Sequence, residues 1–532
     1  MKFHRLSWIL FTLALFGALV GFFISIVNPS SSFFGSIVKD EIKASDLAAQ
    51  VDCDFPLRSS DQVGIRDLAY PSKSIPGELV VHFDNRKDYL AYLEALINAD
   101  IAPLGQIDEL LVVRIPESAL LQTNFGQFGA RASYSYPIEC PLPPVEIDSE
   151  ALASLRAYGL SACAITGGEI AGQGEGVIVA ILDSGIQAHP QFDEVYIVPI
   201  DLAGGGVGRS AAHGTSVASI ITGSEGIAPA VELFVVRVLD DEGLGNSYDA
   251  AQGIVQAVDH GAQIINMSLG VYQDTPVLRQ AVKYADDRGV IMVAAAGNDG
   301  YNRMPYPAAY SEVLAVTAVD ANRQHALFPN QSEEIDFAAP GVGILTAKEE
   351  EGTTLFSGTS AATPFVSGTL ASLMSGAAAL PPRQAVEILK RYLNDQGAPS
   401  ADPVYGAGLV DWDRLRERAT PNLLDVALAD IYLQPDAQPG TTMPIEVTVQ
   451  NRGTNWFSDA QLEVFVGEGE PVSFFLGSLG PGQTTTRKVF TQIPTLDSDE
   501  TLNLAARVLP KELEDDVRLN NNLKAVTFRP AK

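Results

Sequence analysis

Apolar runs rich in β-branched residues recur through the middle of this 532-residue chain, and stretches with helical periodicity separate them. The runs cover residues 177–182, 233–238, 264–269, 290–295 and 313–319, and the helical stretches include residues 249–260 and 276–288. Near-continuous apolar strands joined by helical crossovers are typical of a parallel sheet that is covered on both faces. The pattern therefore predicts an α/β domain over residues 145–418, built on a doubly wound, mostly parallel sheet.

A shorter version of this alternation precedes the α/β domain. Residues 78–83 and 110–115 predict strands, and residues 87–99 between them carry apolar side chains on a helical period. A strand, a helix and a second strand in so short a stretch predict a small α+β domain, which we assign to residues 73–137.

The period of the apolar positions changes to two after residue 420. Short predicted strands cover residues 425–433, 445–449, 462–466, 485–490 and 502–508, and turns containing glycine, proline or asparagine separate them. Regular short strands with such turns are typical of an antiparallel β-sandwich. We assign this β-sandwich to residues 421–532.

The beginning of the chain carries an uncharged apolar segment. Residues 8–27 contain no charged side chain and follow Lys2 and Arg5. A segment of this length can span a bilayer, and the basic residues before it keep the N-terminus on the cytoplasmic side. We interpret residues 1–27 as a signal peptide or an uncleaved signal-anchor, and residues 28–72 as a linker. The rest of the chain is then expected outside the cytoplasm, attached to the membrane only if the segment is retained.

The charge of the chain narrows the class of partner. Its formal net charge is −30 and its pI is about 4.5. Binding to phosphate backbones needs basic surfaces, so we exclude nucleic acid as a partner. Residues 138–420 hold 35 acidic and 15 basic side chains. This excess indicates either solubility outside the cell or a preference for cationic substrates.

Cysteine is rare, with Cys53, Cys140 and Cys163 as its only occurrences in the sequence. None of the three has the spacing of a metal ligand, so the sequence predicts no metal site and no required cofactor. Two alternatives stay open for the thiols. Either Cys140 and Cys163 form a disulfide in an exported chain, or all three are free.

Three polar side chains mark places where apolar elements begin or end. Asp183 follows the first apolar run, His213 opens a short helix, and Ser360 opens a strongly apolar helix. Pro364 fits that helix if it lies in the first turn. A helix N-terminus favours developing negative charge, and a serine hydroxyl needs a base and an orienting acid to act as a nucleophile. The set therefore indicates nucleophilic catalysis.

The order of Asp183, His213 and Ser360, each in its local sequence context, resembles that of the subtilisin-like serine proteases. A fourth stretch agrees, because the run 290–295 leads into Asn298, which is similar to that family's oxyanion asparagine. The resemblance implies that Ser360 attacks the scissile carbonyl, His213 accepts its proton and Asp183 orients the imidazole. It also implies that Asn298 and the Ser360 N–H bind the oxyanion.

The same resemblance implies a substrate cleft. Ser268, Leu269 and Gly270 resemble the strand that lines the family's first specificity pocket, and Gly245 lies in a stretch similar to the strand that pairs with the substrate backbone. Pairing through main-chain groups is compatible with broad specificity. Where many relatives carry glycine, this chain has Pro305, which either narrows the pocket or has no effect.

The flanking domains have resemblances of their own. Residues 73–137 are similar to the family's inhibitory propeptide, with residues 134–136 as the candidate stretch for the cleft and self-cleavage expected between residues 130 and 155. Residues 421–532 look like the Ig-like (CARDB-type) domains of bacterial surface proteins, which suggests a cell-surface partner. The short loop 223–229 indicates that one calcium-binding loop of the family is missing. Calcium at other positions stays open.

Three functions are compatible with these observations. The first is an exported serine endopeptidase that is made as a zymogen and acts on proteins or peptides. The second is a relative that transfers the acyl group to an amine or ester, as a peptide ligase or cyclase. The third is an inactive surface-binding protein. The intact set of Asp183, His213, Ser360 and Asn298 favours the first.

Overall fold

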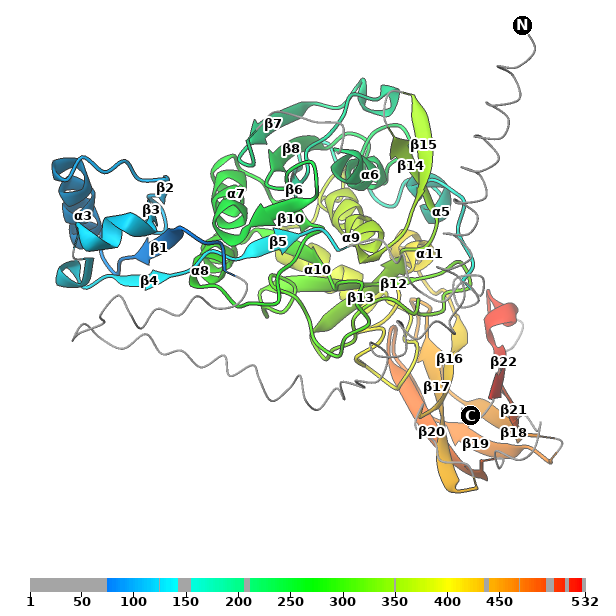
Figure 1. Ribbon diagram of the computed structural model, residues 1–532. Helices are drawn as coiled ribbons and strands as arrows, with labels where there is room; N and C mark the ends of the chain where they lie inside the picture. The colour runs from blue at the N-terminus through cyan, green and yellow to red at the C-terminus, as the bar shows by residue number, and fades with distance from the viewer. Residues whose placement is uncertain are drawn as a thin grey trace, which may run out of the picture. The chain divides into compact units, whose positions relative to one another are not determined.

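The computed structural model describes residues 74–123, 125–141, 155–204, 211–348, 351–434, 440–467, 469–493, 502–511 and 516–528 (Figure 1). The predicted signal or anchor segment (1–27), the predicted linker (28–72) and Cys53 lie outside these residues. Within the described ranges, no helix has both the length and the apolar character needed to cross a bilayer.

A seven-stranded parallel sheet forms the centre of the α/β domain, in the order β13-β12-β11-β10-β6-β8-β7. Its strands are β6 (Ile178–Asp183), β7 (Ile197–Asp201), β8 (Glu232–Arg237), β10 (Ile264–Met267), β11 (Ile291–Ala295), β12 (Val313–Val319) and β13 (Ile335–Pro340). The predicted fold class is confirmed. Five of these strands lie within two residues of their predicted bounds, whereas the two edge strands, β7 and β13, were not predicted.

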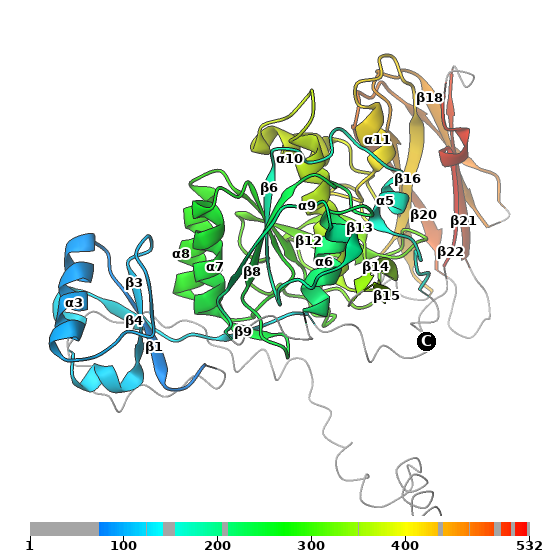
Figure 2. The same cartoon turned by 90° about the horizontal axis from the view of Figure 1, so that it is seen from above.

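Helices cover both faces of this sheet (Figure 2). One face carries α6 (Ala212–Ile221) and α9 (Thr359–Leu373), and the other carries α7 (Ser247–Asp259) and α8 (Pro276–Asp286). Successive residues of β6 alternate between the two cores. Val179 and Ile181 pack with the α6 and α9 side chains, and Ala180 and Leu182 with those of α7 and α8. Burial on both sides explains why β6 is apolar at every position before its final aspartate.

The chain changes direction across the sheet at β6. After β6 it forms β7 and β8 on one side, and it then crosses through β9 (Leu244–Asn246) and α7 to β10 on the other side. In open α/β sheets, the crevice at such a switch point lies beyond the carboxyl ends of the strands. Asp183 is the last residue of β6, so its side chain lies at this crevice.

Shorter elements complete the domain. A hairpin of β14 (Ile344–Lys348) and β15 (Gly352–Phe356) precedes α9. The other helices within the described residues of this domain are α5 (Ala162–Thr166), α10 (Pro382–Arg391), α11 (Trp412–Glu417) and the 3-10 turn η4 (Pro190–Phe192).

The N-terminal part is a four-stranded antiparallel sheet with one α-helix. Its elements are β1 (Glu78–His82), α3 (Arg86–Asn98), β2 (Gly105–Ile107), β3 (Val112–Pro116), the 3-10 turns η2 (Glu117–Leu121) and η3 (Phe125–Phe128), and β4 (Arg131–Ser133). Both faces of the sheet are apolar. Leu79 and Val81 pack in a cluster with side chains of α3. Val80, by contrast, belongs to the same apolar cluster as α7 and α8 of the α/β domain.

Two antiparallel sheets form the C-terminal part, as predicted. One has the order β16-β17-β20 and the other β19-β18-β21-β22. The strands are β16 (Val426–Leu433), β17 (Thr442–Asn451), β18 (Ala460–Val466), β19 (Val472–Leu476), β20 (Thr484–Gln492), β21 (Leu502–Pro510) and β22 (Leu523–Phe528), with a 3-10 turn η6 (Leu519–Asn521). Side chains from both sheets share one apolar core, which explains the alternating burial along β21.

Candidate active site

Asp183 and His213 are in direct contact at the crevice. The Nδ1 of His213 lies 2.9 Å from Oδ1 and 3.0 Å from Oδ2 of Asp183. The carboxylate is fully buried, and its Oδ1 also accepts hydrogen bonds from the N–H of Ser184 at 2.7 Å and its hydroxyl at 3.2 Å. A buried carboxylate held in this way fixes the orientation and the tautomer of the imidazole.

Close backbone packing brings the start of α6 to the end of β6. A methyl group added to Gly214 would lie 2.1 Å from the carbonyl oxygen of Gly185 and 3.1 Å from Oδ1 of Asp183. Only glycine allows that approach, so Gly214 holds the neighbouring His213 against the carboxylate. The imidazole also forms a T-shaped contact with the ring of Phe356 from β15, with centroids 5.3 Å apart.

Ser360 is the second residue of α9 and is almost fully buried. Its Oγ and the Nε2 of His213 are both buried, and neither has a hydrogen-bond partner among the described residues. The imidazole is therefore tied to Asp183 through one nitrogen and leaves the other available as a proton acceptor. A hydroxyl without a partner at a helix N-terminus suits a nucleophile.

Asn298 lies beside the first turn of α9. Its Oδ1 accepts hydrogen bonds from the N–H and the hydroxyl of Thr359, both at 2.9 Å. Gly358, with φ of 131°, makes room, because a methyl group there would lie 2.9 Å from Nδ2 of Asn298. With its oxygen held by Thr359, Asn298 has its side-chain N–H₂ left as a donor.

The cleft contains a segment of the chain itself. Strand β5 (Pro137–Glu139) pairs antiparallel with β9, with Ile138 opposite Gly245. On the other side, the N–H of Glu139 donates to the carbonyl of Gly270 at 3.2 Å and its carbonyl accepts from the N–H of Gly270 at 2.9 Å. The segment therefore lies as an added strand between two stretches of the α/β domain.

This segment ends at the candidate oxyanion donor. The N–H of Cys140 donates to the carbonyl of Gly243 at 3.2 Å, and the Nδ2 of Asn298 donates to the carbonyl oxygen of Pro141 over a long 3.4 Å. The stretch in the cleft is thus 137–141 rather than the expected 134–136. Tyr136 still contributes at the cleft's far end, where its carbonyl accepts from the N–H of Ser247 at 2.9 Å.

The predicted substrate-binding residues lie along the same segment. Gly245 and Gly270 flank it directly. Ser268 is fully buried behind the nucleophile, where its hydroxyl donates to the carbonyl of Ser360 at 3.2 Å, and Leu269 is a buried core residue. Gly245 thus lies on one side of the cleft segment and Gly270 on the other, and the roles of all four residues stay predictions.

Of the two alternatives for the thiols, a disulfide between Cys140 and Cys163 is excluded, and the expected position of Pro364 is wrong. Cys140 and Cys163 are both free thiols, because the first lies in the cleft segment and the second in α5. Helix α9 begins at Thr359 and ends at Leu373, so Pro364 lies in its second turn and not its first. The described residues contain no cluster of three or more histidine, cysteine or acidic side chains that could hold a metal ion.

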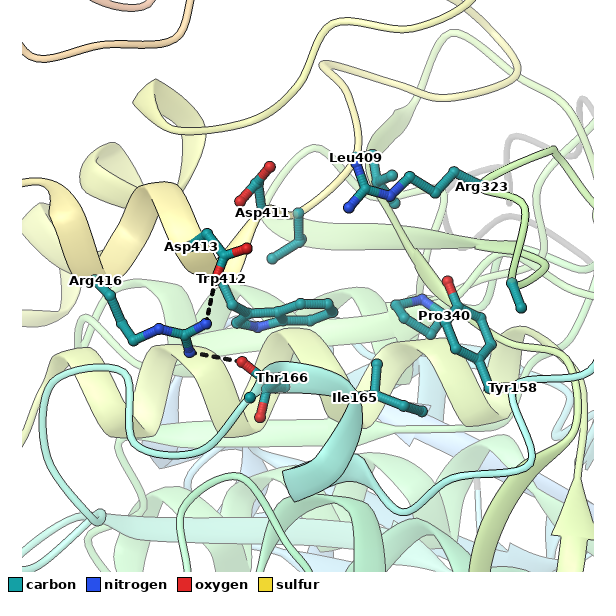
Figure 3. A pocket seen from close by; sticks show the side chains of 13 residues that line it. Tyr158, Ile165, Thr166, Arg323, Pro340, Leu409, Asp411, Trp412, Asp413 and Arg416 are labelled. Atoms are coloured by element: carbon teal, nitrogen blue, oxygen red, sulfur yellow. Dashed lines mark hydrogen bonds and ion pairs between the residues drawn. The ribbon is translucent and has the colours of Figure 1, made fainter. Parts of the chain in front are cut away.

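A separate crevice of about 320 Å³ lies between α5 and α11 (Figure 3). The guanidinium of Arg416 bridges it, donating to the carbonyl of Thr166 at 2.6 Å and to Asp413 at 2.5 Å. None of the four candidate catalytic residues lines this crevice. Arg416 pairs with Asp413 there, and Asp411 bonds to Asn394, so these groups serve local structure rather than a reaction site.

Sequence reasoning missed two residues that shape the site. The hydroxyl of Thr359 accepts from the N–H of Gly297 at 3.1 Å while it donates to Asn298, so it sets the orientation of the asparagine amide. Buried Asn330 donates to the carbonyl of Ala296 at 2.9 Å and holds the same loop. The position of Thr359 next to Ser360 was the one available signal, whereas nothing in the sequence marks Asn330.

Known proteins resemble this chain in sequence. A sequence model of the subtilase family matches residues 174–408. The thermostable alkaline protease of Halalkalibacterium halodurans is 38% identical over 251 residues, which cover 44% of this chain and 66% of that protein. Subtilisin BL of Lederbergia lenta is 36% identical over 250 residues, which cover 45% of this chain and 90% of that protein. The chain thus spans just under two thirds of the first relative and most of the second.

A solved structure also shares the fold. Fervidolysin from Fervidobacterium pennivorans, a keratinolytic enzyme related to subtilisin, has a TM-score of 0.55 at 18% identity, with 86% of this chain and 91% of that chain covered. This likeness concerns the fold alone. Together with the central sheet and the match to nearly all of subtilisin BL, it leads to one assignment: the chain belongs to the subtilase family of serine endopeptidases.

Proposed function

We propose that this protein hydrolyses peptide bonds with Ser360 as nucleophile, His213 as general base and acid, and Asp183 as the residue that orients the imidazole. The observation that carries the proposal is a peptide segment in the cleft whose carbonyl oxygen, on Pro141, accepts from Asn298. An extended chain is thus bound beside an unpaired serine hydroxyl and an imidazole held by a buried carboxylate.

The reaction follows from these positions. The Oγ of Ser360 attacks the carbonyl carbon while its proton passes to Nε2 of His213. Negative charge on the carbonyl oxygen is stabilised by Nδ2 of Asn298 and the N–H of Ser360. The C–N bond then breaks, and the imidazolium gives its proton to the leaving amine. Water attacks the acyl-enzyme with His213 again as base, which releases the acid and restores the serine.

A fluorophosphonate probe tests this assignment, because it labels only an activated serine. We expect labelling at Ser360 in the full-length protein and none in Ser360→Ala. Asp183→Asn should lower the rate of peptide hydrolysis about 10⁴-fold with the fold retained. Labelling at another serine, or turnover by Ser360→Ala above a few per cent of wild type, would remove the proposal.

The relatives named above are proteases, which favours hydrolysis over the two alternatives. A peptide ligase or cyclase would also react with the probe but would join the acyl group to an added amine. Mass spectrometry of products formed with excess amine separates these cases. An inactive binding protein would show neither labelling nor products.

We propose that residues 73–137 act as an inhibitory propeptide and that the chain cuts itself after Pro141. In support, Arg114 of β3 pairs with Asp249 of α7 at 3.3 Å and lies over the ring of Tyr248. The side chain of His82 contacts Gln280 of α8 at 3.2 Å. Docking of the β-sheet on these helices would direct the following segment through the cleft.

Intact-mass analysis tests the maturation step. Wild type should yield a new N-terminus at Leu142, whereas Ser360→Ala should keep its full mass. Because nucleophile and peptide bond belong to one chain, the rate should not change with protein concentration. Equal full-length masses for both proteins would leave residues 73–137 as an ordinary N-terminal domain.

We further propose that the protein acts outside the cytoplasm, either anchored by residues 1–27 or released after their removal. The β-sandwich, proposed as residues 421–532, would then serve contact with a cell-surface partner. The apolar segment after Lys2 and Arg5 supports export. Cell fractionation with an antibody against the sandwich distinguishes the anchored form from the released form.

A further inference from the structure

We propose that Pro305 fills the pocket that receives the side chain immediately before the cut, so that the enzyme cleaves after compact residues such as alanine, glycine or proline. The substrate class would be peptides with such a residue before the cut and a branched aliphatic residue three positions earlier. This inference rests on the proposed function and deepens it, because it names the substrate of the same site.

The register of the cleft segment locates the pocket. Glu139 pairs with Gly270, and Cys140 bonds to Gly243 on the opposite wall. The thiol of Cys140 lies against the Gly243 wall, where an added methyl group would be 3.0 Å from its sulfur. The carbonyl of the next residue, Pro141, lies at Asn298, so we place its side chain beside the neighbouring stretches that contain Gly297 and Gly270.

Pro305 occupies the space behind that wall. A methyl group added to Gly270 would lie 2.8 Å from Cβ and 3.1 Å from Cγ of Pro305. One added to Gly297, the neighbour of Asn298, would lie 3.4 Å from the same Cγ. The ring thus touches both backbone stretches that border the reacting carbonyl. It is buried, and the flanking pairing of Val271 with Tyr306 fixes it in place.

A ring wedged between two glycines leaves little depth for a substrate side chain. Forcing a large side chain into a filled space demands backbone movement, whereas a small side chain needs none. The chain's own segment agrees, because its residue at this position is Pro141. Proline adds no flexible atoms, and its missing N–H leaves no donor unsatisfied.

The cleft also selects the substrate side chain three residues before Pro141, at the position of Ile138. Ile138 is fully buried and shares an apolar cluster with Leu239, Tyr248 and Leu269. Glu139, by contrast, is exposed, so its position should tolerate any side chain. Burial of an aliphatic side chain contributes binding energy that a polar or missing side chain cannot.

The test uses internally quenched peptides of sequence Ile-Glu-Ala-X-Leu-Ser with the self-processed protein. X is alanine, proline, leucine or phenylalanine, and mass spectrometry locates each cut. We expect kcat/KM for X = alanine to exceed that for phenylalanine at least tenfold. Pro305→Gly should raise the value for phenylalanine at least tenfold and change that for alanine less than threefold. Replacing the peptide's isoleucine by aspartate should raise KM at least tenfold.

Ala309→Gly is the matched control, since it adds a glycine to the same loop without opening the pocket. It should leave the ratio of alanine to phenylalanine unchanged. Two results would overturn the inference: equal cleavage after phenylalanine and alanine by wild type, or an unchanged ratio in Pro305→Gly. Fluorophosphonate labelling of Ser360 is measured on every sample. Labelled protein with the wrong preference contradicts only this inference, whereas unlabelled protein without cleavage contradicts the proposed function.

Discussion

The carbonyl oxygen of Ser360 accepts a hydrogen bond from the hydroxyl of Ser268 at 3.2 Å. In a regular helix this carbonyl would bond to the N–H four residues later, but that residue is Pro364, which has none. Ser268 belongs to a buried chain of polar groups that continues through Asn266 to the hydroxyl of Ser367 at 2.8 Å. Because Pro364 leaves the Ser360 carbonyl free, Ser268 can bind it and connect the backbone of the nucleophile to the central sheet.

Ser268→Ala should therefore disturb the nucleophile without touching the triad. The variant leaves the Ser360 carbonyl without its donor, and we expect a loss of about 1–3 kcal/mol in the free energy of unfolding. Combining it with Pro364→Ala restores an N–H at the helical position and should recover part of that loss. Urea unfolding of both single variants and the double variant measures the coupling. Strictly additive losses would show that the two residues do not share this carbonyl.

Thr359→Ala should lower kcat more than it changes KM. Without its hydroxyl, the Asn298 amide loses one of its two bonds from Thr359 and can turn its oxygen toward the cleft. We expect a loss of roughly tenfold, smaller than the 10²–10³-fold loss expected for Asn298→Ala. Thr359→Ser keeps the hydroxyl and should stay near wild type. Equal kcat values for the alanine and serine variants would exclude the orienting role.

A fall in pH should protonate His82 and thereby weaken the docking of the N-terminal domain on the α/β domain. Burial lowers the pKa of His82 to about 4 in the docked state. If undocking from Gln280 exposes the ring, its pKa returns to about 6.5, so the free domain binds a proton that the docked domain does not. Docking is then unaffected above about pH 6.5 and weakens as the pH falls, by roughly thirtyfold at pH 5.

Size-exclusion chromatography of the self-cleaved complex at pH 7.5 and pH 5 measures this effect. His82→Gln should remove the difference between the two pH values, since glutamine keeps a hydrogen bond and carries no charge. His260→Gln, at a histidine that pairs with Glu232, is the control and should behave as wild type. The idea fails if His82→Gln dissociates at pH 5 as readily as wild type.

Asp395 should destabilise the junction with the β-sandwich at neutral pH. Its N–H bonds to Gln450 of β17, its Oδ1 has no hydrogen-bond partner among the described residues, and burial raises its pKa to about 6. A raised carboxyl pKa means that ionisation favours the unfolded chain above pH 6, whereas below about pH 4 both states are protonated. Asp395→Asn should raise the free energy of unfolding by about 1–3 kcal/mol at pH 8 and by little at pH 4.

Thermal unfolding at the two pH values checks the Asp395 prediction. Asp413→Asn, which alters a largely exposed carboxylate, serves as the control and should change neither curve. A gain of equal size at pH 4 and pH 8 would mean that the charge of Asp395 is not the cause.

The sequence predicted the central sheet because strands buried on both faces, such as β6 and β10, must be apolar throughout. It missed β7, an edge strand with a proline and exposed positions, whose pattern resembles a loop. Asp183, His213 and Ser360 were visible because each stands at the end of a strongly apolar element. The contact of Thr359 with Asn298 was not visible, because 61 positions separate them and only the packing of α9 beside β11 joins them.

The structure of the cleft segment, residues 137–141, also depends on residues far away in the sequence and could not be predicted from its own pattern. Its sequence carries no period of its own, since Pro137 and Pro141 interrupt any strand pattern, and its strand exists only because Gly245 and Gly270 pair with it. Pro305 could be noticed from the sequence as an unusual residue. Its effect depends on the distances to Gly270 and Gly297, which no one-dimensional pattern contains.

Among the described residues, helix α3 packs on one face of the N-terminal sheet, and the α/β domain covers the other face, with Val80, Ile107 and Val112. Once cut and detached, this sheet would expose those side chains to water. A small sheet with one bare apolar face is marginally stable. We therefore expect the free fragment to unfold and to be digested by the enzyme it has just left. The duration of inhibition would then be set by the rate at which the fragment unfolds, and not by the affinity of the folded fragment for the enzyme.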